Sequence, residues 1–299
     1  MPAVTGATLG IVAALVSALA WAIGAILFRR IGERATPTAM NLAKSLLGLG
    51  MIGAGALAAG LTPLDGESAW RLALSGVLGI AIGDTLFFAA LVRLEPRLTL
   101  LLATVGQVFT VVAAAAVLGE RPTLLGWTGI ALVIVGVGGV LQAGAEPGHS
   151  TGRDRLTGIV CGVLSAAATS GGLLLAKTGV ASVGTLEATW IRLAAGVVAL
   201  ALWGAVRGHI RADFAALRLP GFLRQIAVAV TVVMFGGFWL SLVSLKFTDA
   251  TIASALAATE PIFILPLAWL WLGERVGWPA IVGAVVAVAG VVLIVVGAA

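Results

Sequence analysis

Long apolar runs, separated by short breaks that contain charged residues, Gly or Pro, dominate the chain. Each run is about 20 residues long, which is the length a helix needs to cross the hydrocarbon core of a bilayer. The runs are apolar on every face, whereas strands of a membrane barrel would alternate polar and apolar positions. The pattern therefore predicts about ten transmembrane helices. They run at roughly 8–28, 38–61, 72–92, 98–118, 126–144, 157–176, 186–206, 225–245, 251–272 and 278–297.

The same pattern occurs twice along the chain. The tetrapeptide Leu-Gly-Glu-Arg stands at 118–121 and again at 272–275, and the glycine-rich run after each copy also matches. The earlier part of each half repeats at a slightly shorter spacing, so that Ser17 and Lys44 align with Ser165 and Arg192. Such self-similarity indicates one structural unit used twice. The predicted organisation is a first repeat at 1–144, a polar linker at 145–156 and a second repeat at 157–299.

The number of helices in each unit has a geometric consequence. Five helices are an odd number, so the second unit must enter the membrane from the opposite side to the first. The sequence thus predicts an all-α membrane protein made of two inverted five-helix repeats, related by a pseudo-two-fold axis in the membrane plane. Inverted repeats of this kind are a recurring transporter design, with the substrate site near the midplane between the halves.

Composition agrees with a lipid environment and excludes several other classes. Hydrophobic residues make up 60% of the chain and charged residues 10%, against roughly 25% charged in a soluble domain. The net charge of +5 comes from Arg and Lys placed between apolar spans, which favours anchoring at lipid headgroups over nucleic-acid binding. The single cysteine, Cys161, excludes a disulfide within the chain, and His149 and His209 are too far apart in sequence to suggest a metal site. We expect no cofactor.

Two tandem apolar units ending in Leu-Gly-Glu-Arg, with Glu260-Pro261 inside the ninth helix, resemble the drug/metabolite transporter superfamily and its EamA-like branch. The resemblance implies a ten-helix exporter or exchanger of small metabolites in the cytoplasmic (inner) membrane, with a central cavity between the halves. It also implies that both termini lie in the cytoplasm. The basic residues gather in the loops of one side, and the positive-inside rule applied to them places the termini outside, so sidedness stays open. The first half departs from the family pattern, since Gly106 and Gln107 occupy the positions of Glu260 and Pro261.

Two carboxylates are predicted to lie near the middle of membrane helices. An ionisable side chain is costly there, so Asp84 in the third span and Glu260 in the ninth are candidates for substrate or coupling-ion binding. Neither has a matching acid in the other half, where Phe238 and Gly106 stand. Burial disfavours the charged form of a carboxylate, which suits proton coupling or a cation site. The alternative is a carboxylate that only locks helices together through hydrogen bonds.

Pro261 strengthens the prediction for Glu260. A proline within a helix removes one backbone hydrogen bond and frees a carbonyl, and Thr259 adds a hydroxyl beside it. Broken helices at the midplane are where transporters coordinate substrates and ions. The alternative is that Pro261 only shapes the helix bundle, because membrane helices tolerate proline when neighbours restore the bonding.

Lys44 and Arg192 occupy equivalent positions in the second and seventh helices. They could neutralise Asp84 or Glu260, or hold an anionic group of the substrate. The alternative is that each long side chain extends to the headgroups.

Three further residues are candidates for the cavity wall. Gln107 could donate a hydrogen bond to the substrate, and Trp21 and Trp239 could line the cavity, with packing as the alternative for each.

Together these features predict a secondary active transporter that moves small metabolites by alternating access, as an exporter or exchanger. Its partners would be the substrate and the lipid bilayer, and not nucleic acid. Whether protons also take part stays open, and the assembly would be a monomer or a homodimer. A membrane-embedded enzyme is disfavoured because the chain lacks a Walker loop, an HExxH pair and a nucleophile elbow. A structural or regulatory subunit without transport would leave Asp84, Glu260 and Pro261 unexplained together.

Overall fold

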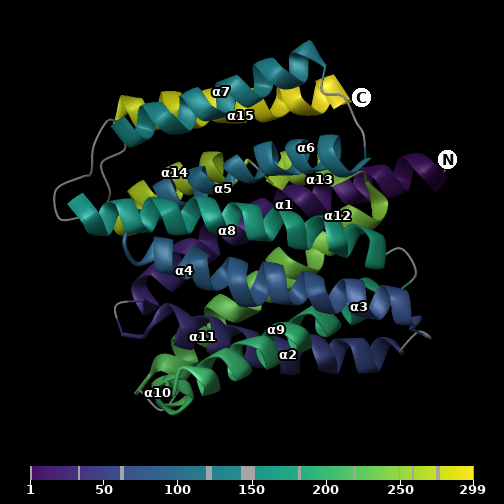
Figure 1. The fold of residues 1–299 in the computed structure, drawn as a ribbon, viewed down its shortest axis with the longest axis vertical. Helices are drawn as coiled ribbons and strands as arrows, with labels where there is room; N and C mark the ends of the chain where they lie inside the picture. Colours follow the sequence, from purple (N-terminus) through teal and green to yellow (C-terminus); the bar gives the residue numbers. More distant parts are fainter. Residues whose placement is uncertain are drawn as a thin grey trace.

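The computed structural model describes residues 2–32, 34–60, 64–118, 123–142, 152–180, 183–217, 220–248, 250–257, 259–273 and 277–298. These residues form helices joined by short turns, and no β-strand occurs among them. Residues 119–121 of the first Leu-Gly-Glu-Arg copy and residues 274–275 of the second lie outside these ranges. Figure 1 shows the helices stacked side by side across the bundle, with both chain ends at the same end of it.

The helices of the two halves follow one another in the same order. The first half contains α1 (Pro2–Ile31), α2 (Pro37–Ala59), α3 (Gly66–Ser75), the π-helix η1 (Gly76–Asp84), α4 (Thr85–Leu91), α5 (Pro96–Ala103), α6 (Val105–Leu118) and α7 (Leu124–Gln142). The second contains α8 (Gly152–Gly179), α9 (Thr185–Val206), α10 (Ile210–Ala216), α11 (Phe222–Thr231), the π-helix η2 (Val232–Trp239), α12 (Leu240–Phe247), α13 (Ala250–Ala257), α14 (Glu260–Leu272) and α15 (Trp278–Ala298).

Several of these helices are long and apolar enough to cross a membrane. Within the described residues the spans by this measure are Gly6–Ile31, Pro37–Ala59, Gly66–Leu91, Gly152–Gly179, Thr185–Val206 and Phe222–Phe247, and shorter apolar helices occur at Leu124–Val140, Glu260–Leu272 and Trp278–Ile294. The prediction of an all-α, multi-pass membrane protein is confirmed.

Helix starts follow local capping rules. Thr36 accepts a hydrogen bond from the Ala39 N–H at 3.2 Å. Pro37 occupies the first turn, where a backbone N–H has no partner within the helix, so the N–H that proline lacks is not missed. Asp65 caps α3 in the same manner, accepting from the Ser68 N–H at 2.8 Å. Such caps satisfy backbone N–H groups that a helix start otherwise leaves unpaired.

The last helices of the two halves, α7 and α15, lie against each other as an outer pair (Figure 1). Their backbones approach so closely that a Cβ on Gly136 would lie 2.6 Å from the Gly283 carbonyl oxygen, and one on Gly290 would lie 2.6 Å from that of Gly129. The repeat equates Gly129 with Gly283 and Gly136 with Gly290. The repeat thus turns one contact into the other, as a two-fold relation between the halves requires.

A second pair of contacts obeys the same relation deeper in the bundle. The Ser17 hydroxyl donates to the Gly237 carbonyl at 2.9 Å, and its counterpart Ser165 donates to the Gly83 carbonyl at 2.8 Å. Both carbonyls belong to π-helical segments, which are frequent at functional sites. The first helix of each half therefore donates a hydrogen bond to the π-helical part of the third span in the other half.

We expect Ser17→Ala and Ser165→Ala each to lower the free energy of unfolding by about 1 kcal/mol, because each removes one buried hydrogen bond. The double variant should lose roughly the sum, since the two bonds share no partner. Reversible unfolding in mixed detergent micelles measures this. Thr178→Ala, which breaks only a local exposed bond, is the matched control, and a double variant no less stable than this control would contradict the prediction.

The fourth helix is interrupted in both halves. The break lies at Thr104 between α5 and α6, and at Thr259 just before α14, and each threonine hydroxyl donates 2.6 Å back to the carbonyl of the residue three before it. Pro261 accordingly stands in the first turn of α14 and not inside a continuous helix, a position where its missing N–H costs nothing. The span predicted at 98–118 is broken as well, although it contains no proline.

The short helix α10 lies in the connection between α9 and α11, which is longer than the corresponding connection between α2 and α3 in the first half. Asp213 on α10 is 8% exposed and accepts hydrogen bonds from Thr38 at 3.0 Å and Thr36 at 3.3 Å. The insertion is thereby tied to the start of α2. The repeat places Gly184 and Leu186 where Thr36 and Thr38 stand, so the second half has no hydroxyls for an equivalent tie.

Candidate functional site

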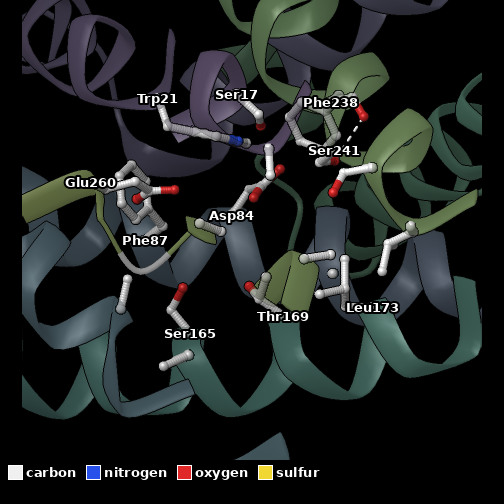
Figure 2. A pocket seen from close by; sticks show the side chains of 18 of the residues that line it. Ser17, Trp21, Asp84, Phe87, Ser165, Thr169, Leu173, Phe238, Ser241 and Glu260 are labelled. Atoms are coloured by element: carbon white, nitrogen blue, oxygen red, sulfur yellow. Dashed lines mark hydrogen bonds between the residues drawn. The ribbon is translucent and has the colours of Figure 1, made fainter. Parts of the chain in front are cut away.

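A cavity of about 170 Å³ lies between the two halves. Figure 2 shows residues from α1, η1 and α4 of the first half facing residues from α8, η2 and α12 of the second, with Glu260 at one side and Asp84 near the centre. This is the location that inverted repeats favour for a substrate site.

The cavity has walls of different chemistry. One is aromatic: the Trp21 ring lies 5.0 Å from the Phe238 ring and 6.2 Å from the Phe87 ring, centroid to centroid. The lining also carries the hydroxyls of Ser165 and Thr169 on α8 and of Ser241 and Ser244 on α12, with Ser241 beside Phe238 (Figure 2). In the repeat, Trp21 corresponds to Thr169 and Phe87 to Ser241. The halves have therefore diverged at the cavity itself, which suits a ligand that is apolar on one side and polar on the other.

Asp84 forms an ion pair with Lys44. Asp84 closes η1 and is 7% exposed, whereas Lys44 on α2 is fully buried. The Lys44 ammonium also lies over the Phe238 ring at 4.9 Å and over the Phe88 ring at 5.6 Å, in cation–π range. Lys44 therefore points into the bundle and does not extend to the headgroups.

Arg192, the repeat counterpart of Lys44, is held differently. It is 5% exposed and lines the cavity, with Nη2 beside the backbone of Gly79. Across the residues that the structure describes, its guanidinium makes neither an ion pair nor a hydrogen bond, and its buried Nε is unsatisfied. Asp84 is the acid whose charge acts on it most, but the Asp84 hydrogen bond goes to Lys44.

Glu260 is the first residue of α14 and faces the cavity near Trp21 and Phe87 (Figure 2). The helix N-terminus favours a negative charge at this position. Within the described ranges the Glu260 carboxylate has no hydrogen-bond or ion-pair partner. Two opposite charges without partners, Arg192 and Glu260, thus share one cavity with the neutral Lys44–Asp84 pair.

The other predicted site residues are placed as follows. Thr259 holds the helix break beside Glu260, and Pro261 is buried. Trp239 donates from Nε1 to the Thr185 hydroxyl at 3.1 Å and is not among the residues that line the cavity; its neighbour Phe238 takes that place. The side chain of Gln107 lies outside the described residues.

Sequence reasoning did not predict the four hydroxyl side chains of the cavity lining. Their signal was present, because Ser165 and Thr169 lie one turn apart on α8, as do Ser241 and Ser244 on α12. A hydropathy pattern alone does not separate such a face from a lipid-facing one. No group of three His, Cys, Asp or Glu side chains that could hold a metal ion occurs in the described part of the chain.

Comparison with known proteins identifies the family. The model of the EamA-like transporter family matches residues 8–142 and, a second time, residues 156–296. The chain belongs to the EamA-like transporter family. It is therefore a membrane transporter, as the resemblance in the sequence indicated.

One curated member resembles this EamA-like transporter in sequence. The "Probable terminal-alkyne amino-acid exporter" of Streptantibioticus cattleyicolor is 31% identical over 226 residues, which cover 75% of this chain and 72% of that protein. A protein known from a crystal structure shares the fold, with a TM-score of 0.62 at 15% identity and 95% of each chain covered. That second likeness concerns the fold alone.

Proposed function

We propose that this EamA-like transporter is a secondary active exporter of small amphipathic metabolites across the cytoplasmic membrane. The repeats at 1–144 and 157–299, joined by the linker at 145–156, would rock about the cavity so that it opens to one side at a time. The observation that carries the proposal is the cavity itself, which lies between exchange-related halves and contains two charges, Arg192 and Glu260, that have no partner among the described residues. The likeness to the amino-acid exporter of Streptantibioticus cattleyicolor supports export, with an amino acid as the substrate class to examine first.

Glu260 is the group that we assign to proton or cation coupling. It lies where a helix is broken, faces the cavity and has no cation beside it among the described residues. A carboxylate in such a place is costly to keep charged unless a cation or a proton accompanies it. Asp84, in contrast, is neutralised by Lys44, so its charge needs no coupling ion.

Reconstitution into liposomes tests the proposal. Purified protein would be assayed for exchange of labelled amino acids, propargylglycine among them, and of amines, sugars and other metabolites, with and without a pH gradient. Exchange of at least one compound supports the proposal. Absence of exchange for every compound would favour the alternative of a membrane subunit without transport.

We expect Glu260→Gln to retain exchange at equal pH but to lose most of the stimulation by a proton gradient, by about tenfold or more. The physical reason is that glutamine keeps the shape of the side chain and cannot release a proton. Uptake into vesicles with an acidic lumen measures the effect, because protons leave as the substrate enters. Glu67→Gln, which alters an exposed acid paired with Arg71, is the control. Unchanged stimulation in Glu260→Gln would remove Glu260 from the coupling mechanism.

A further inference from the structure

The two repeat-related cations, Lys44 and Arg192, have unequal surroundings. Lys44 is fully buried, bonded to Asp84 and enclosed by the rings of Phe88 and Phe238. Its ammonium is thereby neutralised by the protein. No part of the Lys44 side chain is left for a ligand.

Arg192 lacks the acid that its counterpart has. The repeat equates Asp84 with Phe238, so the second half has kept the cation of the pair and has an apolar ring where the acid would stand. The guanidinium lines the cavity, and its Nε has no acceptor among the described residues. A buried cation without a partner is strongly unfavourable, so the empty position calls for an anionic group.

Among the described residues that line the cavity, Arg192 and Glu260 are the charges without an ion pair, and neither acid of the lining is bonded to Arg192. Asp84 acts on Arg192 electrostatically but makes its hydrogen bond and ion pair with Lys44. Glu260 is the other acid lining the cavity, and none of the ion pairs of the described residues joins it to Arg192. The planar guanidinium offers two parallel N–H groups that match the two oxygens of a carboxylate.

We propose that the carboxylate of the transported molecule binds Arg192 and takes, in the second half, the place that Asp84 occupies in the first. The substrates are then small molecules with a free carboxylate, and their apolar part lies against Trp21, Phe87 and Phe238. This inference rests on the proposed transport function and adds the substrate class and its anchoring residue. An inorganic anion such as chloride is the other source of negative charge, and the experiment separates the two.

The test uses matched pairs of labelled probes that differ only in the carboxyl group, namely propargylglycine and leucine with their amides. Proteoliposomes with the full chain are expected to exchange each acid at least about tenfold faster than its amide, as the loss of one charged, desolvated contact implies. Arg192→Gln should abolish this preference. Arg192→Lys should retain part of it, because lysine keeps the positive charge but lacks the two parallel N–H donors of the guanidinium. Arg71→Gln, at a half-buried arginine on α3 that does not line the cavity, should leave the ratio unchanged.

The acid-to-amide ratio is the readout that a merely structural arginine would not move. Equal exchange of acids and amides by the unaltered protein overturns the inference and leaves the transport proposal standing. The inference is also overturned if chloride alone raises the melting temperature and the exchange rates of acids and amides do not differ. A preference that persists in Arg192→Gln also overturns it. Absence of exchange for every compound in the wider panel overturns the transport proposal, and this inference with it.

Discussion

The variant Lys44→Met is expected to lose about 3–5 kcal/mol of unfolding free energy, because it leaves the Asp84 carboxylate buried without its cation. Both residues are almost wholly enclosed, at 0% and 7% exposed, and Asp84 is in contact with the cavity only. Lys44 also contributes cation–π contacts with Phe88 and Phe238, which the thioether of methionine does not reproduce. Unfolding in mixed detergent micelles measures the loss.

The double variant Lys44→Met, Asp84→Leu is the control for this prediction. Replacing a buried ion pair by apolar residues of similar volume is often neutral or stabilising, so most of the lost free energy should return. A double variant as unstable as the single one would show that packing, and not the unpaired charge, causes the loss. Lys246→Met serves as a comparison, because Lys246 donates to the Val183 carbonyl and its loss leaves no carboxylate without a cation. The free energy of unfolding of the two lysine variants is then compared.

The second large effect is expected for Gly76→Ala. Gly76 begins η1, and a Cβ there would meet the carbonyl oxygen of Arg192 far inside contact distance, with the Arg192 carbonyl carbon at 2.8 Å. These are backbone atoms, so no side-chain rotation can relieve the overlap, and η1 must separate from α9. We expect a loss at the upper end of overpacking costs, about 3 kcal/mol, accompanied by slower transport because Arg192 moves.

Two helical glycines provide the matched control. Gly50 on α2 and Gly171 on α8 have nothing within 4 Å of the place where a Cβ would stand. Alanine at these positions should leave stability unchanged or raise it by up to about 1 kcal/mol, the difference in helix propensity. The comparison uses melting temperature and exchange rate. Similar losses in all three variants would mean that the effect of Gly76 is not steric.

The helices and their duplication could be predicted from the sequence because they depend on composition and spacing alone. Apolar runs long enough for a bilayer located the spans, and repeat-related pairs such as Ser17 and Ser165 indicated the two halves. Asp84 and Glu260 could be placed near the cavity because a charge in a membrane helix has few other reasons to exist.

The unequal roles of Lys44 and Arg192 could not be predicted, since the repeat makes their positions equivalent. Which cation receives the Asp84 bond depends on the packing of α2 against η1, a contact that the spacing along the sequence does not determine. Likewise the break at Thr104 carries no proline to announce it. Phe238 and not Trp239 faces the cavity, because neighbouring residues of a helix point in different directions and hydropathy does not set the rotation of an apolar helix.

On the alternating-access mechanism proposed above, the hydrogen bonds at the end of the bundle opposite to the termini would bias the balance between the transport states. There Arg30 donates to the Trp271 carbonyl at 2.7 Å, and Thr38 donates to Asp213 at 3.0 Å. The repeat places Thr178 and Leu186 where Arg30 and Thr38 stand, and neither can form the mirrored bond. If the halves exchange conformations during the cycle, the opposite state lacks both bonds, each worth roughly 0.5–1.5 kcal/mol. The unloaded protein would then rest in the present state, and the driving gradient would act mainly on the return step.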